Sequence, residues 1–230
     1  MTVYVGRNVK VVEQRPVEEL VSHKLIRWYD YFHVYQSTGT HKAWWTQTNA
    51  EPPPSQGMNE LTDSEYERIA KSDNVRFSRT TNIGGCYIVM RFRFKLAFPE
   101  EDLKKLRLKF EGYGVRGSDY GVTMKVWNHV SGAWEHETTG TGSGDEEITI
   151  TITTNIPNYV DADGYVYVLV RTTYADDGTN HATLYCDYAK CLITRAKFKV
   201  LHTPISDLDQ DGVPDEPEHV MVLVNGSEVT

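Results

Sequence analysis

Twelve residues near the C-terminus combine side-chain types and a spacing that suit a metal ion. Oxygen ligands recur at positions 1, 3, 5, 9 and 12 of Asp207–Glu218, and Gly212 at position 6 permits a sharp turn. A calcium ion (Ca2+) with about seven ligands needs carboxylates at alternate positions, one main-chain carbonyl and a closing glutamate. The expected ligands are Asp207, Asp209, Asp211, Val213 through its carbonyl, Asp215 and Glu218. The sequence therefore predicts calcium as the cofactor.

Prolines around this segment argue against an EF-hand. Pro204 precedes the segment, and Pro214 and Pro217 lie within it, where they oppose flanking helices. The segment resembles the D-x-D-x-D-G-x-P-D calcium repeats of thrombospondin type 3 modules, and the resemblance implies the same carboxylates as calcium ligands. The chain contains one such repeat, whereas that family has tandem repeats. The alternative interpretation is a solvated acidic linker.

The acidic charge of the chain is concentrated in this C-terminal region. The formal net charge is −8, yet residues 201–230 hold seven acidic side chains and neither lysine nor arginine. The other 200 residues carry 25 acidic and 24 basic side chains. This distribution indicates a local cation site, and it gives no basic face for nucleic acid. No apolar run reaches the length of roughly 20 residues that spans a membrane.

The middle of the chain predicts an all-β fold. Apolar residues alternate with polar ones along 88–98, 106–110 and 147–153, which is typical of strands with one buried face. Residues 165–170 are apolar on both faces, so this strand should lie centrally. Strands are also expected over 181–188 and 192–200, with Leu192 facing the core. Glycine-rich turns separate these segments, and the pattern favours an antiparallel β-sandwich, specifically a jelly roll.

Three regions are expected along the chain. Residues 1–60 form an N-terminal arm that contains a paired strand over 2–12 and the proline-rich segment Glu51–Gly57. Residues 61–200 form the sandwich and begin with a short helix, because Thr62-Asp-Ser-Glu65 is a capping-box pattern. Residues 201–230 hold the calcium loop and a terminal strand. The opening residues, MTVYVGRNVKV, are similar to the start of structural proteins of tailed viruses.

Tryptophans supply a second set of candidate ligand-binding residues. The segment 73–198 looks like a carbohydrate-binding jelly roll in its order of strands and turns, which implies that exposed aromatic rings stack on sugars. Trp127, Trp134 and Trp45 are the candidates. The alternative is that Trp127 and Trp134 pack on each other across a hairpin. Trp44 and Trp45 are adjacent, so one should face the core and the other should face outward.

Catalytic signals are weak. The eight histidines show no pair at metal-binding spacing, and no G-x-S-x-G, P-loop or dinucleotide-binding glycine pattern occurs. Cys86, Cys186 and Cys191 match no zinc pattern, and a bridge between the last two stays open.

These features together favour a non-enzymatic, calcium-binding structural protein of a virion or extracellular surface. In that hypothesis calcium orders the terminal strand, which then pairs with a neighbouring subunit in a homo-oligomer or larger assembly, or with residues 2–12 of its own chain. The alternative is a carbohydrate-binding module that uses Trp127, Trp134 or Trp45 to bind a glycan.

Overall fold

The structure, a computed structural model, describes residues 2–5, 10–14, 26–30, 41–96, 103–195, 198–202, 220–224 and 227–229. The chain divides into two compact units, which we describe separately. The larger unit spans Trp28–Ile193, and the smaller one combines Met1–Arg27 with Thr194–Thr230.

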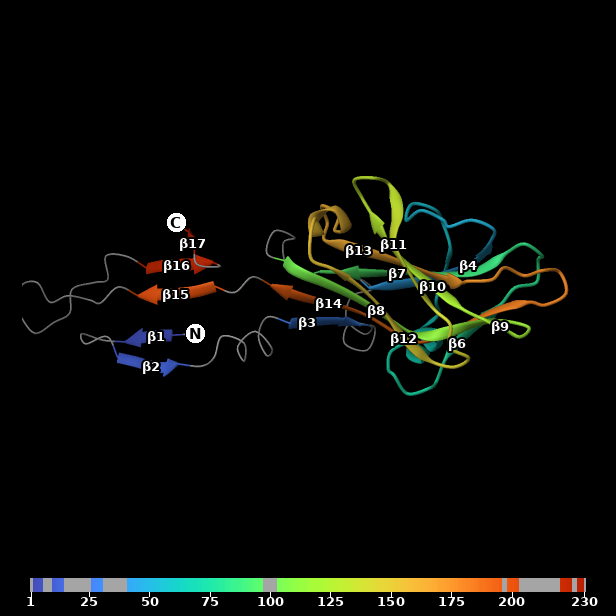
Figure 1. Ribbon diagram of the computed structural model, residues 1–230, viewed down its shortest axis with the longest axis horizontal. Helices are drawn as coiled ribbons and strands as arrows, with labels where there is room; N and C mark the ends of the chain where they lie inside the picture. Colours follow the sequence, from blue (N-terminus) through green and yellow to red (C-terminus); the bar gives the residue numbers. More distant parts are fainter. Residues whose placement is uncertain are drawn as a thin grey trace, which may run out of the picture. The chain divides into compact units, whose positions relative to one another are not determined.

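Two antiparallel β-sheets form the larger unit (Figure 1). The first sheet has the order β11-β10-β13-β7-β4-β5. Its strands are β4 (Lys42–Thr48), β5 (Asn59–Glu60), β7 (Tyr87–Lys95), β10 (Val122–Asn128), β11 (Ala133–Gly140) and β13 (Tyr165–Thr172). The chain crosses between the sheets from β7 to β8, from β11 to β12 and from β13 to β14, so the predicted β-sandwich of jelly-roll type is confirmed.

The second sheet has the order β12-β8-β14-β3, with β6 beside β14 and β9 beside β8. Its strands are β3 (Ile26–Asp30), β6 (Phe77–Thr80), β8 (Leu103–Arg116), β9 (Asp119–Tyr120), β12 (Glu146–Ile152) and β14 (Ala182–Arg195). A 3-10 helix, η2 (Ile156–Tyr159), precedes β13.

The core lies between the inward faces of the two sheets. Alternation along β8 and β12 buries Leu106, Leu108 and Ile150, and the ring of Phe92 from the first sheet lies 6.2 Å from that of Phe110 in the second. Burying one such side chain contributes about 1.5–3 kcal/mol. Strand β13 lies between β10 and β7, as its apolar sequence predicts.

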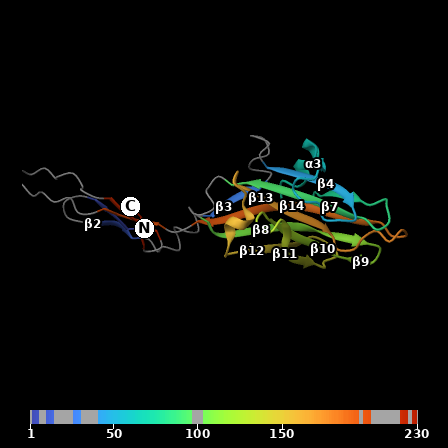
Figure 2. The ribbon, with the colours of Figure 1, turned by 90° about the horizontal axis from the view of Figure 1, so that it is seen from above.

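Helix α3 (Asp63–Arg68) confirms the predicted helix start (Figure 2). The Thr62 N–H donates to Glu65 Oε2 over 2.8 Å, which completes the capping box. The Tyr66 hydroxyl accepts a hydrogen bond of 2.8 Å from the Ala43 N–H, so this helix is tied to β4.

Two boundaries differ from the sequence prediction. A single strand, β14, covers residues 182–195, where two strands were expected over 181–188 and 192–200. Leu192 does not face the core. Cys186 and Asp187 are both buried, so the alternation shifts by one residue there and Cys191 and Ile193 face inward instead. Strand β4, which the prediction assigned to the arm, pairs with β7 within the sandwich.

Cys186 and Cys191 cannot bond to each other. They lie five residues apart along β14, roughly 16 Å at the usual rise of a strand, whereas a disulfide needs Cα atoms within about 7 Å. Both thiols are buried, and burial raises their pKa, so they act as small apolar groups of the core.

Five short strands form the described part of the smaller unit. β1 (Thr2–Val5) pairs with β2 (Lys10–Gln14), which confirms the paired strand at the N-terminus. β15 (Phe198–His202) pairs with β16 (Val220–Val224), and β16 pairs with β17 (Ser227–Val229). The terminal strand, expected to pair with a neighbouring subunit or with residues 2–12, pairs instead with β15 and β17. The calcium-loop prediction, Asp207–Glu218, lies outside the described residues.

Candidate functional site

Five aromatic side chains on the outer face of the first sheet form what we call the aromatic face: Trp44, Trp127, Trp134, Tyr165 and Tyr167. Val126 pairs with Val168 and both are buried in the core, so the following Trp127 and the preceding Tyr167 point outward. All five side chains of the aromatic face are half-buried, so each ring retains some exposed surface.

Trp127 and Trp134 lie opposite each other on β10 and β11. Their ring centroids are 5.1 Å apart with an interplanar angle of 70°, an edge-to-face contact. The interpretation that these two residues pack across the hairpin is therefore confirmed. Because the contact is edge-to-face, it does not stack the two ring faces on each other.

The structure separates the two adjacent tryptophans of β4. Trp45 packs against the core, so this candidate does not lie on the aromatic face. Trp44 pairs with Arg91 on the outer side and belongs to that face. The sequence predicted that the two rings point in opposite directions, but the choice of Trp45 as the outward one is wrong. The burial of the neighbouring Ala43, which pairs with Phe92, fixes this register.

A proline-rich segment, residues 51–56, lies along the aromatic face, and we call it the strap. The carbonyls of Pro53 and Gln56 each accept a 2.9 Å hydrogen bond from Arg91 Nη1. The Pro52 carbonyl accepts one of 3.2 Å from Trp134 Nε1. The prolines restrict the backbone and offer no N–H groups, and the segment then turns, with the Pro53 carbonyl also accepting a 3.0 Å hydrogen bond from the Gln56 N–H. The strap thus contacts β7 and β11, two strands that do not adjoin.

Glu51 anchors the start of the strap by charge. Its carboxylate lies 2.9 Å from Lys125 Nζ on β10 and 2.8 Å from Arg171 Nε on β13. Burial raises the pKa of Glu51, but hydrogen bonds from Arg171 and Lys125 outweigh it, so the pKa is lowered overall. Glu51 is therefore ionised at neutral pH and neutralises part of the basic charge on these strands.

Three basic side chains follow one another on the outward side of β7: Arg91, Arg93 and Lys95, which we call the cationic row. Arg93 lies 4.4 Å from the centroid of Tyr165 and 5.4 Å from that of Trp44. Lys95 Nζ lies 4.7 Å from the Tyr165 centroid and donates to the Asp163 carbonyl. These positive charges therefore lie among the rings of the aromatic face.

Several buried polar atoms beside this face have no hydrogen-bond partner among the described residues. They include Nε of Arg91 and of Arg93 and Nε2 of His129. The His129 ring lies 5.9 Å from Tyr167, and burial lowers its pKa, so the imidazole is neutral at neutral pH. Such atoms are uncommon in folded proteins.

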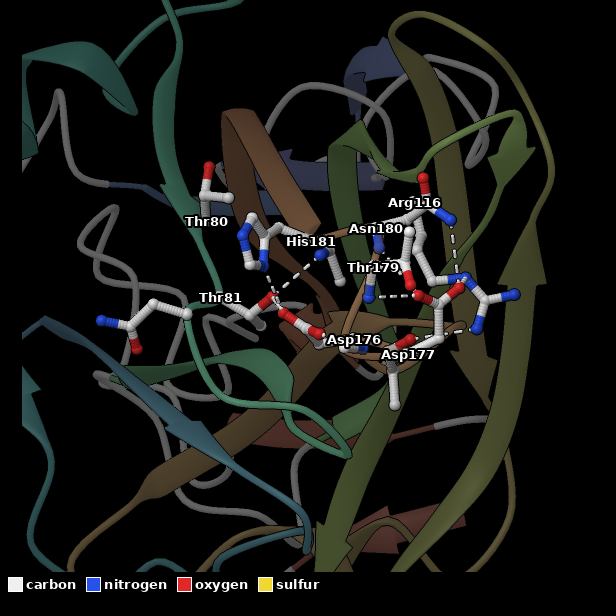
Figure 3. A network of polar contacts seen from close by, with 12 residues as sticks. Thr80, Thr81, Arg116, Asp176, Asp177, Thr179, Asn180 and His181 are labelled. Atoms are coloured by element: carbon white, nitrogen blue, oxygen red, sulfur yellow. Dashed lines mark hydrogen bonds and ion pairs between the residues drawn. The ribbon is translucent and has the colours of Figure 1, made fainter.

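A second polar cluster, the Asp176 network, lies in the turn between β13 and β14 (Figure 3). The buried Asp176 carboxylate accepts hydrogen bonds from Thr81 Oγ1 at 2.6 Å, His181 Nδ1 at 2.7 Å and the Gly178 N–H at 2.7 Å. These hydrogen bonds lower the pKa of Asp176 to about 2, and the one from Thr81 has the largest effect. Thr81 Oγ1 in turn accepts from the Ala182 N–H. The network links β14 to the segment before β7.

The neighbouring carboxylate, Asp177, is also occupied. It accepts hydrogen bonds from the Thr179 and Asn180 N–H groups, and Arg116 Nε lies 3.8 Å away (Figure 3). The sequence predicted a turn at Asp176-Asp-Gly178 but assigned no site role to Asp176 or His181. The same Asp-Asp-Gly signal favours carboxylates that cap backbone N–H groups of the turn.

Within the described ranges, no group of three histidine, cysteine, aspartate or glutamate side chains could hold a metal ion. The predicted ligands Asp207, Asp209, Asp211, Val213, Asp215 and Glu218 lie outside those ranges. Among the described residues, no helix has the length and apolar character needed to cross a membrane.

Solved structures with a similar arrangement include carbohydrate-binding modules. The "xylan-binding module CBM15" is 13% identical, covers 66% of this chain and 90% of its own, and has a TM-score of 0.35. A family 11 carbohydrate-binding module from Clostridium thermocellum is 8% identical; the match covers 73% of this chain and 95% of that module, with a TM-score of 0.29. A tailspike domain of bacteriophage CBA120 is 8% identical; the match covers 74% of this chain and 19% of the tailspike chain, with a TM-score of 0.32.

No curated protein sequence matches the chain. One family model matches residues 38–195, which is more than half of the chain and includes most of the sandwich, the strap and the aromatic face. The chain therefore belongs to the family described as "AF_1625_C: Uncharacterized protein, C-terminal domain".

Proposed function

We propose that the sandwich is a non-catalytic carbohydrate-binding module whose binding surface is the aromatic face. The observation that carries this proposal is the set of five half-exposed rings on the outer face of one sheet, contributed by strands β11, β10, β13 and β4. Sugar rings have apolar C–H faces that pack on aromatic rings, while their hydroxyls need hydrogen-bond partners at the edges. Basic side chains and carbonyls of the strap supply such partners beside the rings.

A row of rings across several strands suits an extended ligand better than a compact one. Trp134, Trp127 and Tyr167 occupy β11, β10 and β13, so their rings follow one line across the strands. Neighbouring strands lie about 4.8 Å apart, so this line extends roughly 10 Å, about the length of two sugar units. The strap lies beside this line, at Arg91 and Trp134.

The proposal is tested by titrating a panel of soluble oligosaccharides while tryptophan fluorescence is recorded. We expect a member of the panel to change the fluorescence saturably, and Trp127→Ala to weaken that binding about 10-fold or more. The matched control is Tyr120→Ala, which removes an exposed aromatic ring of β9 in the other sheet. The proposal fails if no oligosaccharide binds, or if both variants lose affinity equally.

We also propose that Asp207–Glu218 binds calcium and that the ion orders the connection between two paired strands. Its support is the ligand spacing in the sequence together with the antiparallel pairing of β15 with β16, the strands on either side of the segment. Calorimetry with calcium should give a one-site isotherm that Asp209→Asn weakens strongly. An unchanged affinity in this variant would exclude the segment as the site.

An extracellular or virion-surface location would suit both proposals, because glycans and millimolar calcium occur there. Self-assembly remains a proposal as well, but the pairing of β16 removes the unpaired strand on which it depended. Light scattering with and without a chelator tests it directly. A constant particle size would exclude calcium-dependent assembly.

A further inference from the structure

The cationic row differs from the other basic groups of the same sheet face in its charge balance. Lys125 and Arg171 have Glu51 as an ion-pair partner, and Lys42 has Glu60 at 2.9 Å. Neither Arg91 nor Arg93 has a carboxylate within ion-pair distance among the described residues, and Lys95 contacts a carbonyl and a ring. The row therefore leaves positive charge that the described protein does not neutralise.

Two acidic side chains beside these strands, Asp161 and Glu60, already have other partners. Asp161 accepts hydrogen bonds from the N–H groups of Asp163 and Tyr165, and Glu60 pairs with Lys42. Residues two apart on a strand lie about 7 Å from each other on the same face, close enough for like charges to repel. Ring faces attract a cation but carry no net charge, so they do not cancel it.

From this charge imbalance we infer that the ligand is an anionic saccharide, whose carboxylate or sulfate group lies at Arg93 while its sugar rings pack on the aromatic face. This inference rests on the proposed function and specifies the ligand class. Arg93 is flanked by Trp44 and Tyr165, so a bound sugar could contact a ring and the guanidinium together. Guanidinium groups bind planar anions through two parallel hydrogen bonds, which a neutral hydroxyl cannot reproduce.

The partners of Arg91 and Arg93 assign them different roles. Arg91 is buried and donates to two strap carbonyls, so its hydrogen bonds hold the strap. Arg93 is half-buried and lies among the rings of Trp44 and Tyr165 and beside the hydroxyl of Tyr167. We therefore assign the anion contact to Arg93 and treat Arg91 as a positioning residue for the strap.

The test uses a glycan array that pairs each anionic glycan with its neutral counterpart, for example galacturonan with its methyl ester and sulfated with unsulfated chains. Wild-type protein should prefer the anionic member of the pairs that it binds, and the preference should weaken as the salt concentration rises. The carboxylate and sulfate arms of the array show which anion is recognised.

Variants then separate this inference from the proposed function. Arg93→Gln should weaken binding of the best anionic glycan roughly 10- to 100-fold, the usual worth of a charge-assisted hydrogen bond, and change neutral binding little. Arg93→Lys should restore part of the affinity for the anion. Arg107→Gln, a half-buried arginine on the outer side of β8, is the matched control and should change neither.

Each outcome has a definite meaning. If neutral glycans bind as tightly as anionic ones, the inference is wrong while the proposed function stands. If Arg93→Gln keeps the full anionic preference, the anion lies elsewhere and the assignment fails. If no glycan of either kind binds, the proposed function and this inference fail together. Thermal unfolding of each variant confirms that a loss of binding is not a loss of fold.

Discussion

The Asp176 network and the polar side chains beside the aromatic face differ in how completely their hydrogen-bonding atoms find partners. Both oxygens of Asp176 accept hydrogen bonds from within the described protein. On the aromatic face, Nε of Arg93 and Nε2 of His129 have no such partner, and the cationic row lacks carboxylates. The difference is that the described protein supplies partners to both Asp176 oxygens, whereas it supplies none to these two nitrogens.

The Asp176 network contains an aspartate–histidine pair, and its third partner helps to define what the pair does. An aspartate that orients a histidine also occurs in hydrolases, and His181 is 56% exposed on its side chain. However, the third partner, Thr81, donates its hydroxyl proton to Asp176 and accepts from a backbone N–H. Its oxygen is thus turned toward the fold, so the network fastens two segments together.

The largest expected effect comes from Asp176→Ala. This change leaves Thr81, His181 and the Gly178 N–H without their acceptor, so we expect the melting temperature to fall by roughly 5–10 °C. Asp177→Ala, a change in the neighbouring exposed carboxylate, is the control and should cost less. Glycan binding at a temperature where both variants are folded should stay unchanged, and a selective loss with Asp176→Ala would break the contrast between the two regions.

Acid should weaken the Asp176 network in a defined range. The pKa of Asp176 in the folded protein is about 2, whereas the usual value for aspartate is about 3.8. The contribution of the ionised Asp176 to the free energy of unfolding is therefore complete above a pH of about 4. It is lost as the pH falls toward about 2, because Asp176 binds a proton in the unfolded chain at a higher pH than in the folded protein. Urea unfolding at a series of pH values should show this slope.

Asp176→Asn is the matched variant for the acid experiment. It keeps the shape of the side chain and removes the titration, so its stability should depend less on pH between about 4 and about 2. Equal slopes in the two proteins would mean that other carboxylates, such as Glu51, dominate the acid response.

A smaller effect on stability is expected for Glu51→Gln, a change at the strap beside the aromatic face. Hydrogen exchange can then be compared between the strap and the Asp176 network in one experiment. The variant loses the charge that pairs with Lys125 and Arg171, so we expect a loss of about 1 kcal/mol after allowance for solvent screening. Amide hydrogen exchange should increase at Ser55 and Gln56, the strap residues after the prolines that carry an N–H group, and not at Thr81. Glu147→Gln, which breaks the exposed pair with Lys109 on the other sheet, is the control. An unchanged exchange rate in the strap would show that Arg91 and Trp134 hold it unaided.

The smallest effect is expected for His181→Ala. Its imidazole supplies one of the three hydrogen bonds to Asp176 and is largely exposed, so the melting temperature should fall by less than about 3 °C. A decrease as large as that of Asp176→Ala would mean that His181 carries the network, and the comparison would then need revision.

Much of the fold could be predicted from the sequence because local patterns encode it. Alternation in residues 147–153, the doubly apolar run at 165–170 and the capping box at Thr62 each reflect contacts within a few residues or one buried face. The continuity of β14 could not be predicted, because the shift at Cys186 and Asp187 depends on the neighbouring strand. The outward choice between Trp44 and Trp45 likewise depends on the register against β7.

The sequence by itself determined the class of the fold, the start of its helix, the rigidity of the proline-rich strap and the calcium-like spacing of Asp207–Glu218. Tertiary structure alone decided that Trp44, Trp127 and Tyr167 share a face, that the strap reaches Arg91 and that Asp176 meets Thr81. The physical reason is distance along the chain. Strand period, helix caps and proline geometry act over a few residues, whereas a shared surface and its charge balance arise only when distant strands pair.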